Sequence, residues 1–168
     1  MPQTYEPIAT QTVSGSASSV SFTSIPSTYT HLRVIAYGYT NGTGNPAFTL
    51  NGAGTFNAIY NETLYNAGAQ VIRASAQETS RGNNLTNWFG GATSSSTNNT
   101  YVCFDVYNYA SSLAKTGLCR MSSYDLGSST VVSQSVWSSD VTAAVSTLQF
   151  TLSGTWSGMV TIYGIKGA

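Results

Sequence analysis

The sequence predicts an all-β fold: an antiparallel β-sandwich, jelly-roll-like, with roughly ten short strands. The first observation behind this prediction is a repeated alternation of apolar and polar residues, clearest from Thr147 to Leu152. A period of two is typical of a strand that buries one face. Secondly, no segment keeps a helical period for more than about two turns. Thirdly, turn residues separate the alternating runs at spacings of about 8–12 residues.

Length and composition indicate one ordered domain. The chain has 168 residues, which fits a single β-sandwich domain over residues 1–168 that buries roughly 70% of its unfolded surface. Hydrophobic residues make up 41% and aromatic residues 12%, so the chain lacks the composition of a disordered protein. Charged residues are only 7%, and six basic side chains balance six acidic ones. Without a basic patch to hold phosphates, we expect no nucleic-acid partner.

The chain shows no signal for a membrane or for secretion. No stretch approaches the ~20 consecutive apolar residues that span a bilayer, so we expect no membrane partner. The first residues, Met1 to Glu6, contain neither the basic nor the apolar region of a signal peptide. We therefore expect the protein to be made and folded in a cytoplasm.

Strands are predicted in order along the first part of the chain. They cover residues 5–13, 18–23, 30–39, 46–51 and 55–65. The first two are expected to be separated by a turn at Ser14, Gly15 and Ser16. A Gly-rich and Asn-rich loop follows the strand over 30–39.

The second part of the chain contains one irregular region. Residues 71–76 predict a weak strand, with a helical turn as the alternative, and residues 77–100 predict a long surface excursion with one short strand. Regular strands are predicted again over 101–108, 114–122 and 130–137. Residues 148–152 and 160–165 then predict two strands joined by a turn at 153–158. We expect the N-terminal strand to be tied down beside this C-terminal pair or across from it.

The inward-facing positions of these runs predict the core. It is expected to contain Val20, Phe22, Leu32, Val34, Val102, Phe104, Leu148, Phe150, Leu152 and Ile162.

A search for catalytic and metal-binding patterns is negative, and we expect no enzymatic activity, no cofactor and no metal. The one histidine, His31, lies within a predicted strand, and no Gly-x-Ser-x-Gly nucleophile motif accompanies it. One His and two Cys are too few for a zinc site. A glycosidase needs two facing carboxylates. Only chance folding would pair two of the acidic candidates, Glu62, Glu78, Asp105, Asp125 and Asp140.

The two cysteines, Cys103 and Cys119, have a midpoint at residue 111, inside a predicted hairpin loop. A regular antiparallel hairpin would place them directly opposite each other, with Cα atoms about 4.5–5.5 Å apart, close enough for a disulfide. A cytoplasmic origin favours free thiols that act as small hydrophobic residues.

Aromatic residues supply the candidate interface. Exposed aromatic rings beside Asn and Ser can stack on sugars, but aromatic residues are more often core or subunit-interface anchors. The strand over 30–39 has a second, amphipathic face. Its uncharged part, Ile35, Tyr37 and Tyr39, costs roughly 25 cal/mol per Å² of apolar area to leave in water. We also expect a Trp-Phe pair to anchor the excursion, against its own domain or a neighbouring chain. The candidate interface residues are therefore Ile35, Tyr37, Tyr39, Trp88 and Phe89.

Three runs resemble a family of tailed-bacteriophage virion proteins found in aquatic phages. They are residues 5–10 with 20–32, residues 104–110, and residues 160–165. The most specific part is Ser-Ile-Pro-Ser-Thr-Tyr-Thr at 24–30. The family often has Asp at the position of His31, a difference that leaves the strand prediction unchanged.

The resemblance implies a virion surface component without catalytic residues, such as a capsid decoration (cement) protein or a tail-fibre part. We expect a decoration protein that is made in the host cytoplasm, lies on the capsid surface and stabilises the head shell. Its expected partners are the phage major capsid protein and further copies of itself, with a trimer favoured. The alternative is a receptor-binding or carbohydrate-binding module of a tail or head fibre that uses its aromatic residues on host surface glycans.

Overall fold

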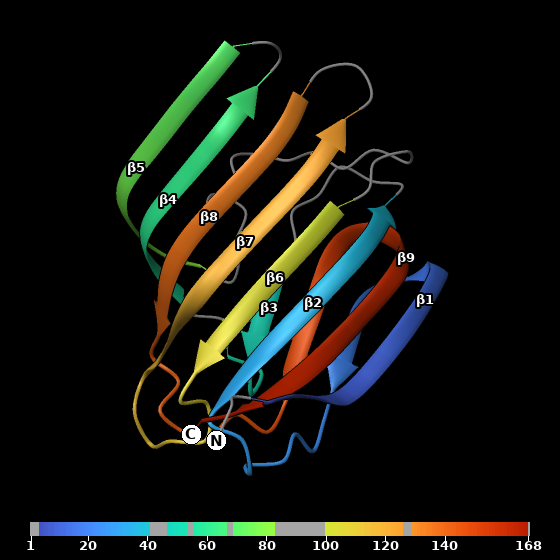
Figure 1. Cartoon of the computed structure of the whole chain (residues 1–168), viewed down its shortest axis with the longest axis vertical. Helices are drawn as coiled ribbons and strands as arrows, with labels where there is room; N and C mark the ends of the chain where they lie inside the picture. Colours follow the sequence, from blue (N-terminus) through green and yellow to red (C-terminus); the bar gives the residue numbers. More distant parts are fainter. Residues whose placement is uncertain are drawn as a thin grey trace.

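The computed structural model describes residues 4–40, 47–53, 56–66, 69–82, 100–125 and 129–167. These residues form strands, turns and loops without a helix (Figure 1). The strands are β1 (Thr4–Phe22), β2 (His31–Thr40), β3 (Ala47–Leu50), β4 (Phe56–Asn66), β5 (Ala69–Gly82), β6 (Thr100–Tyr107), β7 (Lys115–Asp125), β8 (Ser129–Ser139) and β9 (Leu148–Lys166).

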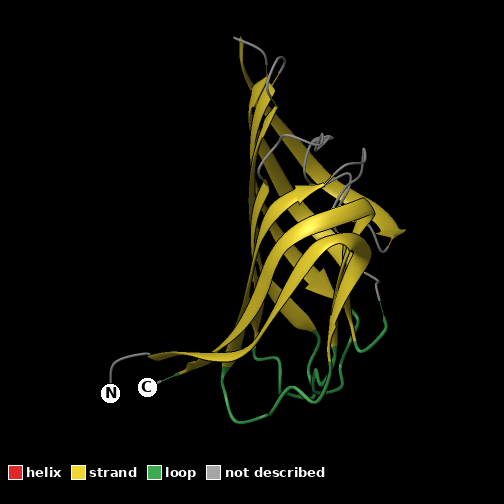
Figure 2. Ribbon diagram, turned by 90° about the vertical axis from the view of Figure 1, so that its right-hand side faces the viewer, coloured by secondary structure: helices red, strands yellow, loops and turns green. Residues whose placement is uncertain are grey.

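All the described strands belong to one antiparallel sheet. Its order is β1-β9-β2-β6-β7-β8-β4-β5, and β3 pairs with β9 outside this path. The sheet curls strongly, so that part of it turns back over the inner side (Figure 2). The prediction of an all-β antiparallel fold is therefore confirmed. The pairing forms one continuous curled sheet, so a jelly-roll-like sandwich stays a prediction.

β9 is the strand that makes the sheet curl. Residues 156–165 pair with β2, whereas residues 148–151 pair with β3. β1 follows both parts of β9 along its other edge. The prediction of two strands joined by a turn at 153–158 is therefore wrong, because the chain bends there without reversing direction.

Two glycines permit the close approach of β9 to β2 at this bend. A Cβ atom on Gly38 would lie 2.3 Å from the Ser157 carbonyl oxygen, and one on Gly158 would lie 2.2 Å from the Tyr37 carbonyl oxygen. Real Cβ atoms do not approach backbone so closely, so only glycine fits at either position. The glycine and serine residues of this segment predict a turn, but in the structure they form a bend within a continuous strand.

The predicted turn at 14–16 is wrong for a similar reason. β1 continues through it, with register shifts against β9 between Ser14 and Ala17 and between Ala17 and Ser19. Gly15 has φ of +66°, which is typical of a glycine in a β-bulge. A bulge uses the same residue types as a turn, but it bends the strand without ending it.

The predicted core is confirmed wherever the structure describes the side chains. Leu152 is the one predicted core residue whose side chain lies outside the described part. The other nine are at most 3% exposed: Val20, Phe22, Leu32, Val34, Val102, Phe104, Leu148, Phe150 and Ile162.

An aromatic stack crosses this core. Phe48 of β3 stacks on Phe104 of β6 at 4.3 Å, and Phe104 stacks on Trp137 of β8 at 4.7 Å. Trp137, Trp156 and Tyr109 are at most 3% exposed. These three aromatic residues are therefore core residues, as expected for most aromatic residues, and their rings are not available to stack on sugars. The stack joins β3 to the inner face of the main sheet.

The irregular region is more regular than predicted. Residues 71–76 lie within β5, so the strand prediction is confirmed there and the helical alternative is wrong. Residues 77–82, predicted to open the excursion, continue the same strand. The rest of the predicted excursion, including Trp88 and Phe89, lies outside the described residues.

Candidate functional site

The candidate site is the outer face of the sheet, by which we mean the side of β9, β2, β6, β7 and β8 opposite the core. Alternation along β2 separates the two sides: Leu32 and Val34 are fully buried, whereas Ile35 is half-buried and Tyr37 is exposed. Successive side chains of a strand point to opposite faces. The predicted interface residues Ile35 and Tyr37 therefore lie on this outer face.

A row of mostly apolar side chains crosses the outer face. Tyr37 of β2 lies directly opposite Tyr101 of β6, and their exposed fractions are 51% and 42%. Tyr101 lies opposite Ser122 of β7, which lies opposite Val132 of β8. Val132 is itself 42% exposed. The row is therefore four strands wide and carries no charge.

The next row along the strands contains the one exposed cation at the centre of this face. Ile35 lies opposite Cys103, Cys103 opposite Arg120, and Arg120 opposite Gln134. Arg120 is exposed. Among the described residues, no carboxylate lies within ion-pair distance of it. Burial raises the pKa of the Cys103 thiol, so this thiol is protonated at neutral pH.

An ion pair between a half-buried arginine and a buried aspartate occupies the third row. The Arg33 guanidinium donates from Nε and Nη2 to the two carboxylate oxygens of Asp105, at 2.6 and 2.8 Å. Its Nη1 donates to the Tyr5 hydroxyl at 2.9 Å, and the guanidinium carbon lies 5.3 Å from the centre of the Tyr5 ring. The hydrogen bonds to Asp105 raise the pKa of Arg33 further above its usual value. The bidentate geometry holds the pair rigidly and neutralises its charge.

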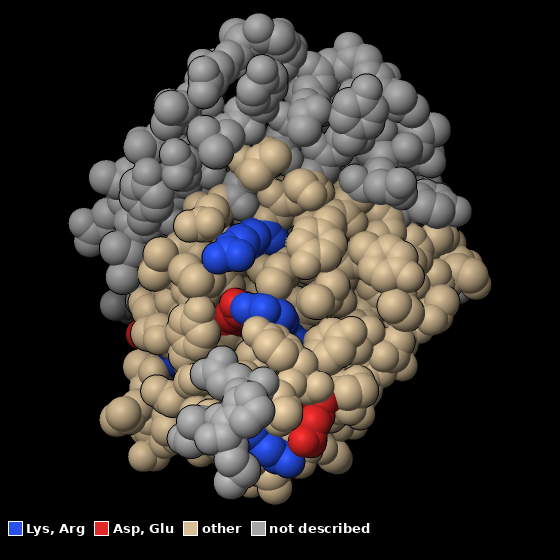
Figure 3. All heavy atoms as spheres, viewed as in Figure 1, with Lys and Arg blue, Asp and Glu red and all other residues tan. Residues whose placement is uncertain are grey.

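The surface around these groups is almost uncharged. Figure 3 shows the outer face, with a few charged side chains in its middle and lower part, surrounded by uncharged residues. Few charged groups on this face would lose their hydration if a partner covered it. Tyr and Arg are among the residue types that contribute most to binding energy at interfaces.

The structure describes only some of the candidate catalytic side chains. Asp105 is engaged by Arg33, and the side chains of Glu62, Glu78 and Asp125 lie outside the described part. His31 accepts a hydrogen bond at Nδ1 from the Asn108 amide at 3.0 Å and packs against the edge of Tyr107. Within the described ranges, no group of three His, Cys, Asp or Glu residues could hold a metal ion.

The cysteines are free thiols, as predicted, but they do not face each other. Cys103 is paired with Arg120, and Cys119 is paired with Phe104. The prediction of directly opposed cysteines is wrong by one residue of register. A one-residue shift moves a side chain to the other face of the sheet. Cys119 is accordingly in the core, whereas Cys103 lies on the outer face.

The chain ends are tied together beside the candidate interface. The Glu6 carboxylate accepts hydrogen bonds from Lys166 Nζ at 3.0 Å and from the Tyr29 hydroxyl at 3.0 Å. The hydrogen bond from Lys166 lowers the pKa of Glu6. The ring of Tyr29 lies against Gly164, where a Cβ atom would come within 2.3 Å of it.

The segments that carry the phage-protein resemblance meet at this end of the sheet, where the two termini also lie (Figure 1). The Tyr109 hydroxyl donates to the Pro26 carbonyl, so residues 104–110 contact the Ser-Ile-Pro-Ser-Thr-Tyr-Thr run. That run reaches Glu6 and Gly164 through Tyr29. The resemblance therefore follows a set of residues in mutual contact.

We call the same end of the molecule the loop end, defined as residues 23–30, 51–53, 108–114 and 140–147 (Figure 2). Asn51, which has φ of +52°, joins two of these loops. Its side-chain amide donates to the Ala144 carbonyl at 2.8 Å, and its oxygen accepts from the Ser146 and Thr147 amides at 2.9 and 3.1 Å. Leu113, in the loop over 108–114, is 69% exposed.

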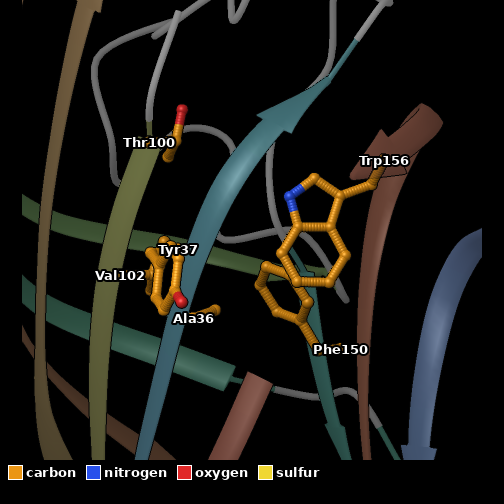
Figure 4. A pocket seen from close by; sticks show the side chains of 6 residues that line it. All are labelled: Ala36, Tyr37, Thr100, Val102, Phe150 and Trp156. Carbon is orange, nitrogen blue, oxygen red and sulfur yellow. The ribbon is translucent and has the colours of Figure 1, made fainter. Parts of the chain in front are cut away.

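A small apolar pocket opens between β2, β6 and the bend of β9 (Figure 4). Its cavity volume is about 10 Å³, room for about one water molecule and far below the roughly 300–1,000 Å³ of pockets that enclose a drug-sized ligand. Phe150 and Trp156 form one wall and are core residues. We interpret it as the open end of the core.

Sequence reasoning found part of this surface. Tyr39 lies on β2 opposite Ser157, but its side chain is outside the described part of the structure. Trp88 and Phe89 lie wholly outside the described residues. The residues that were missed are Tyr101, Arg120, Val132 and Val136, which join the surface because of their register. Only the correct registers of β6 with β7 and of β7 with β8 could have placed them.

Comparison of the chain with protein-family models, with curated proteins and with solved structures found no match. In the part of the chain that the structure describes, no helix has the length and hydropathy to cross a membrane.

Proposed function

We propose that this chain is a non-enzymatic virion structural protein of a tailed bacteriophage, a decoration (cement) protein that binds the head shell and stabilises it. The observation that carries the proposal is the Tyr37–Tyr101 pair, exposed on an almost uncharged sheet face. The resemblance of residues 24–30 and of the other two runs to virion proteins supports the same conclusion.

The outer face suits a large partner. A protein surface can cover the whole row of exposed side chains. Each Å² of apolar area removed from water contributes roughly 25 cal/mol, and a stable interface buries on the order of 1,000 Å² or more. The proposed partners are the phage major capsid protein and other copies of this chain, with a trimer favoured. A jelly-roll-like sandwich and a location on the capsid surface belong to the same proposal.

One observation favours a second candidate, a carbohydrate-binding module of a tail or head fibre. The exposed ring of Tyr101 lies one row away from Arg120 on the neighbouring strand β7, and Gln134 of β8 lies opposite Arg120. Aromatic faces stack on sugar rings, and the neighbouring guanidinium and amide groups can hydrogen-bond to sugar hydroxyls. Host surface glycans would then be the ligand.

The experiment uses virions that lack the protein, to which purified protein is added back. The wild type should bind at a fixed, high copy number and raise the temperature at which the heads release DNA. The Tyr37→Ser, Tyr101→Ser double variant should fold normally and bind at least about tenfold more weakly, because interface tyrosines are energetic hot spots.

Leu113→Ser is the matched control, because Leu113 is exposed but lies away from the outer face. The decoration proposal fails if wild-type protein does not bind heads. Binding of wild type, but not of the double variant, to a panel of bacterial surface glycans would support the second candidate instead.

A further inference from the structure

Lys115 is the one fully buried cation among the described residues. Its exposed fraction is 0%, although lysine is almost never fully buried unless its charge has a partner. In the described part of the chain, no carboxylate lies within ion-pair distance of its ammonium group. A buried charge without a counterion requires other stabilisation.

That stabilisation comes from oxygen atoms of two loops. Lys115 Nζ donates to the backbone carbonyls of Leu113 at 2.5 Å, Ser111 at 2.6 Å and Thr142 at 3.5 Å. The Ser111 hydroxyl lies 3.4 Å away. The three carbonyls can only accept hydrogen bonds, so they match the three donors of an ammonium group. Three carbonyl dipoles aimed at one point are also the ligand type that binds hard monovalent cations.

We propose that the oxygen atoms of Ser111, Leu113 and Thr142 form a monovalent-cation site that the chain fills with its own Lys115 ammonium. The cation joins residues 108–114 to residues 140–147 and so holds two loops of the loop end together (Figure 2). The backbone hydrogen bond from the Val145 amide to the Tyr109 carbonyl, at 2.9 Å, connects the same two loops. This inference does not depend on the proposed function.

Two observations indicate that the loop oxygens form a specific site for the Lys115 ammonium group. The chain has only two lysines, and the other one, Lys166, pairs with Glu6 at the surface with half of its side chain exposed. Burial lowers the pKa of Lys115, and the converging carbonyl oxygens oppose this effect because they stabilise the charged form.

The first test needs no variant. Native protein is treated with an amine-reactive acetylating reagent, and the two lysines are followed by peptide mass spectrometry. Lys166 should react at the rate of an exposed amine, and Lys115 about 100-fold or more slowly, because it reacts only after local opening. Equal rates for the two lysines would overturn the proposal.

The second test empties the site. Lys115→Ala should lower the melting temperature by about 5–10 °C, because it leaves buried carbonyls without donors. Methylammonium chloride or ammonium chloride at about 0.5 M should bind in the emptied site and restore at least half of the lost melting temperature. Tetramethylammonium chloride at the same ionic strength should not, because it has no N–H donor.

Two further variants make the result specific. Lys115→Met keeps the length of the side chain but blocks the site without a charge, so it should be destabilised and not rescued by either salt. Arg120→Ala removes an exposed cation and should show no difference between the salts. A Lys115→Met protein as stable as the wild type, or a Lys115→Ala protein that loses the same stability in every salt, would refute the proposal.

Discussion

Cys119 lies opposite Phe104, not opposite Cys103, so the two cysteines of the β6–β7 hairpin point to different faces of the sheet. Cys119 is 0% exposed and Cys103 is 9% exposed. Because side chains on opposite faces cannot meet without a change of register, no disulfide forms between them in the folded protein.

The first prediction concerns thiol reactivity. In native protein a thiol reagent should modify Cys103 slowly and leave Cys119 unmodified, whereas both should react within the mixing time in denaturant. Mild oxidation should not join them. An intramolecular disulfide between Cys103 and Cys119 in folded protein would contradict the observed register.

The second prediction is a pH dependence of stability. Burial raises the pKa of Cys119 well above its ordinary value of 9.0. As the pH rises above about 9, the unfolded chain loses this thiol proton while the folded chain keeps it, so the free energy of unfolding decreases. Urea denaturation at pH 8 and pH 10 measures the decrease.

Cys119→Val is the matched variant for this measurement, because it keeps a small apolar side chain and removes the ionisable group. The buried tyrosines contribute a decrease of the same sign in both proteins. The difference between the two proteins therefore isolates Cys119. An identical loss of stability in wild type and variant between pH 8 and pH 10 would contradict the prediction.

The third prediction tests the bend of β9. Gly38→Ala and Gly158→Ala should each destabilise the protein by about 3 kcal/mol or more, because the added Cβ atom would overlap backbone atoms of the paired strand. Gly52→Ala, where the new Cβ atom has no neighbour within 4 Å, is the control. It should cost only about 1 kcal/mol, from its positive φ. Equal effects at the three positions in thermal denaturation would show that β9 does not approach β2 this closely.

The fourth prediction concerns the ion pair on the outer face. Arg33→Met leaves the Asp105 carboxylate buried without a counterion and should destabilise the fold by about 2–4 kcal/mol. Arg33→Met combined with Asp105→Leu should recover part of that loss, and a double-mutant cycle measures the coupling. Glu6→Gln, which removes an exposed ion pair, should have a much smaller effect in the same urea titration. A cycle with no coupling would mean that the two side chains do not interact.

The fifth prediction tests the contact between the segments that carry the resemblance. Tyr109→Phe removes the hydroxyl that donates to the Pro26 carbonyl and leaves the buried ring in place. It should cost about 1–2 kcal/mol, because the carbonyl loses its donor inside the protein. Tyr37→Phe, at an exposed tyrosine, should be neutral in the same denaturation experiment. The contact is excluded if Tyr109→Phe is neutral as well.

Local pattern was enough to predict the all-β class and the inward-facing side chains. Period-two alternation depends on neighbouring residues only, so Val34, Phe104 and Phe150 could be assigned to the core before any pairing was known. The exposed position of Tyr37 followed from the same alternation on β2.

The tertiary structure decided whether Gly and Ser residues end a strand or bend it. Gly15 and Gly158 are residues of a type common in turns, yet strands β1 and β9 continue through them. The reason is that a bulge or a close strand crossing requires the same freedom from a Cβ atom as a turn does. What separates the two outcomes is the partner strand, which lies far away in sequence: Gly158 meets Gly38, and Gly15 meets Ser157.

The register between paired strands could likewise not be predicted from the local sequence pattern. The placement of Tyr101 beside Tyr37, of Arg120 at the centre of the outer face and of Lys115 under two loops depends on which residues of β2, β6 and β7 lie opposite one another. Alternation along each strand is enough to separate its inner from its outer side chains. Which of those side chains meet depends on the pairing of distant strands, because a shift of one residue exchanges the two faces of a strand.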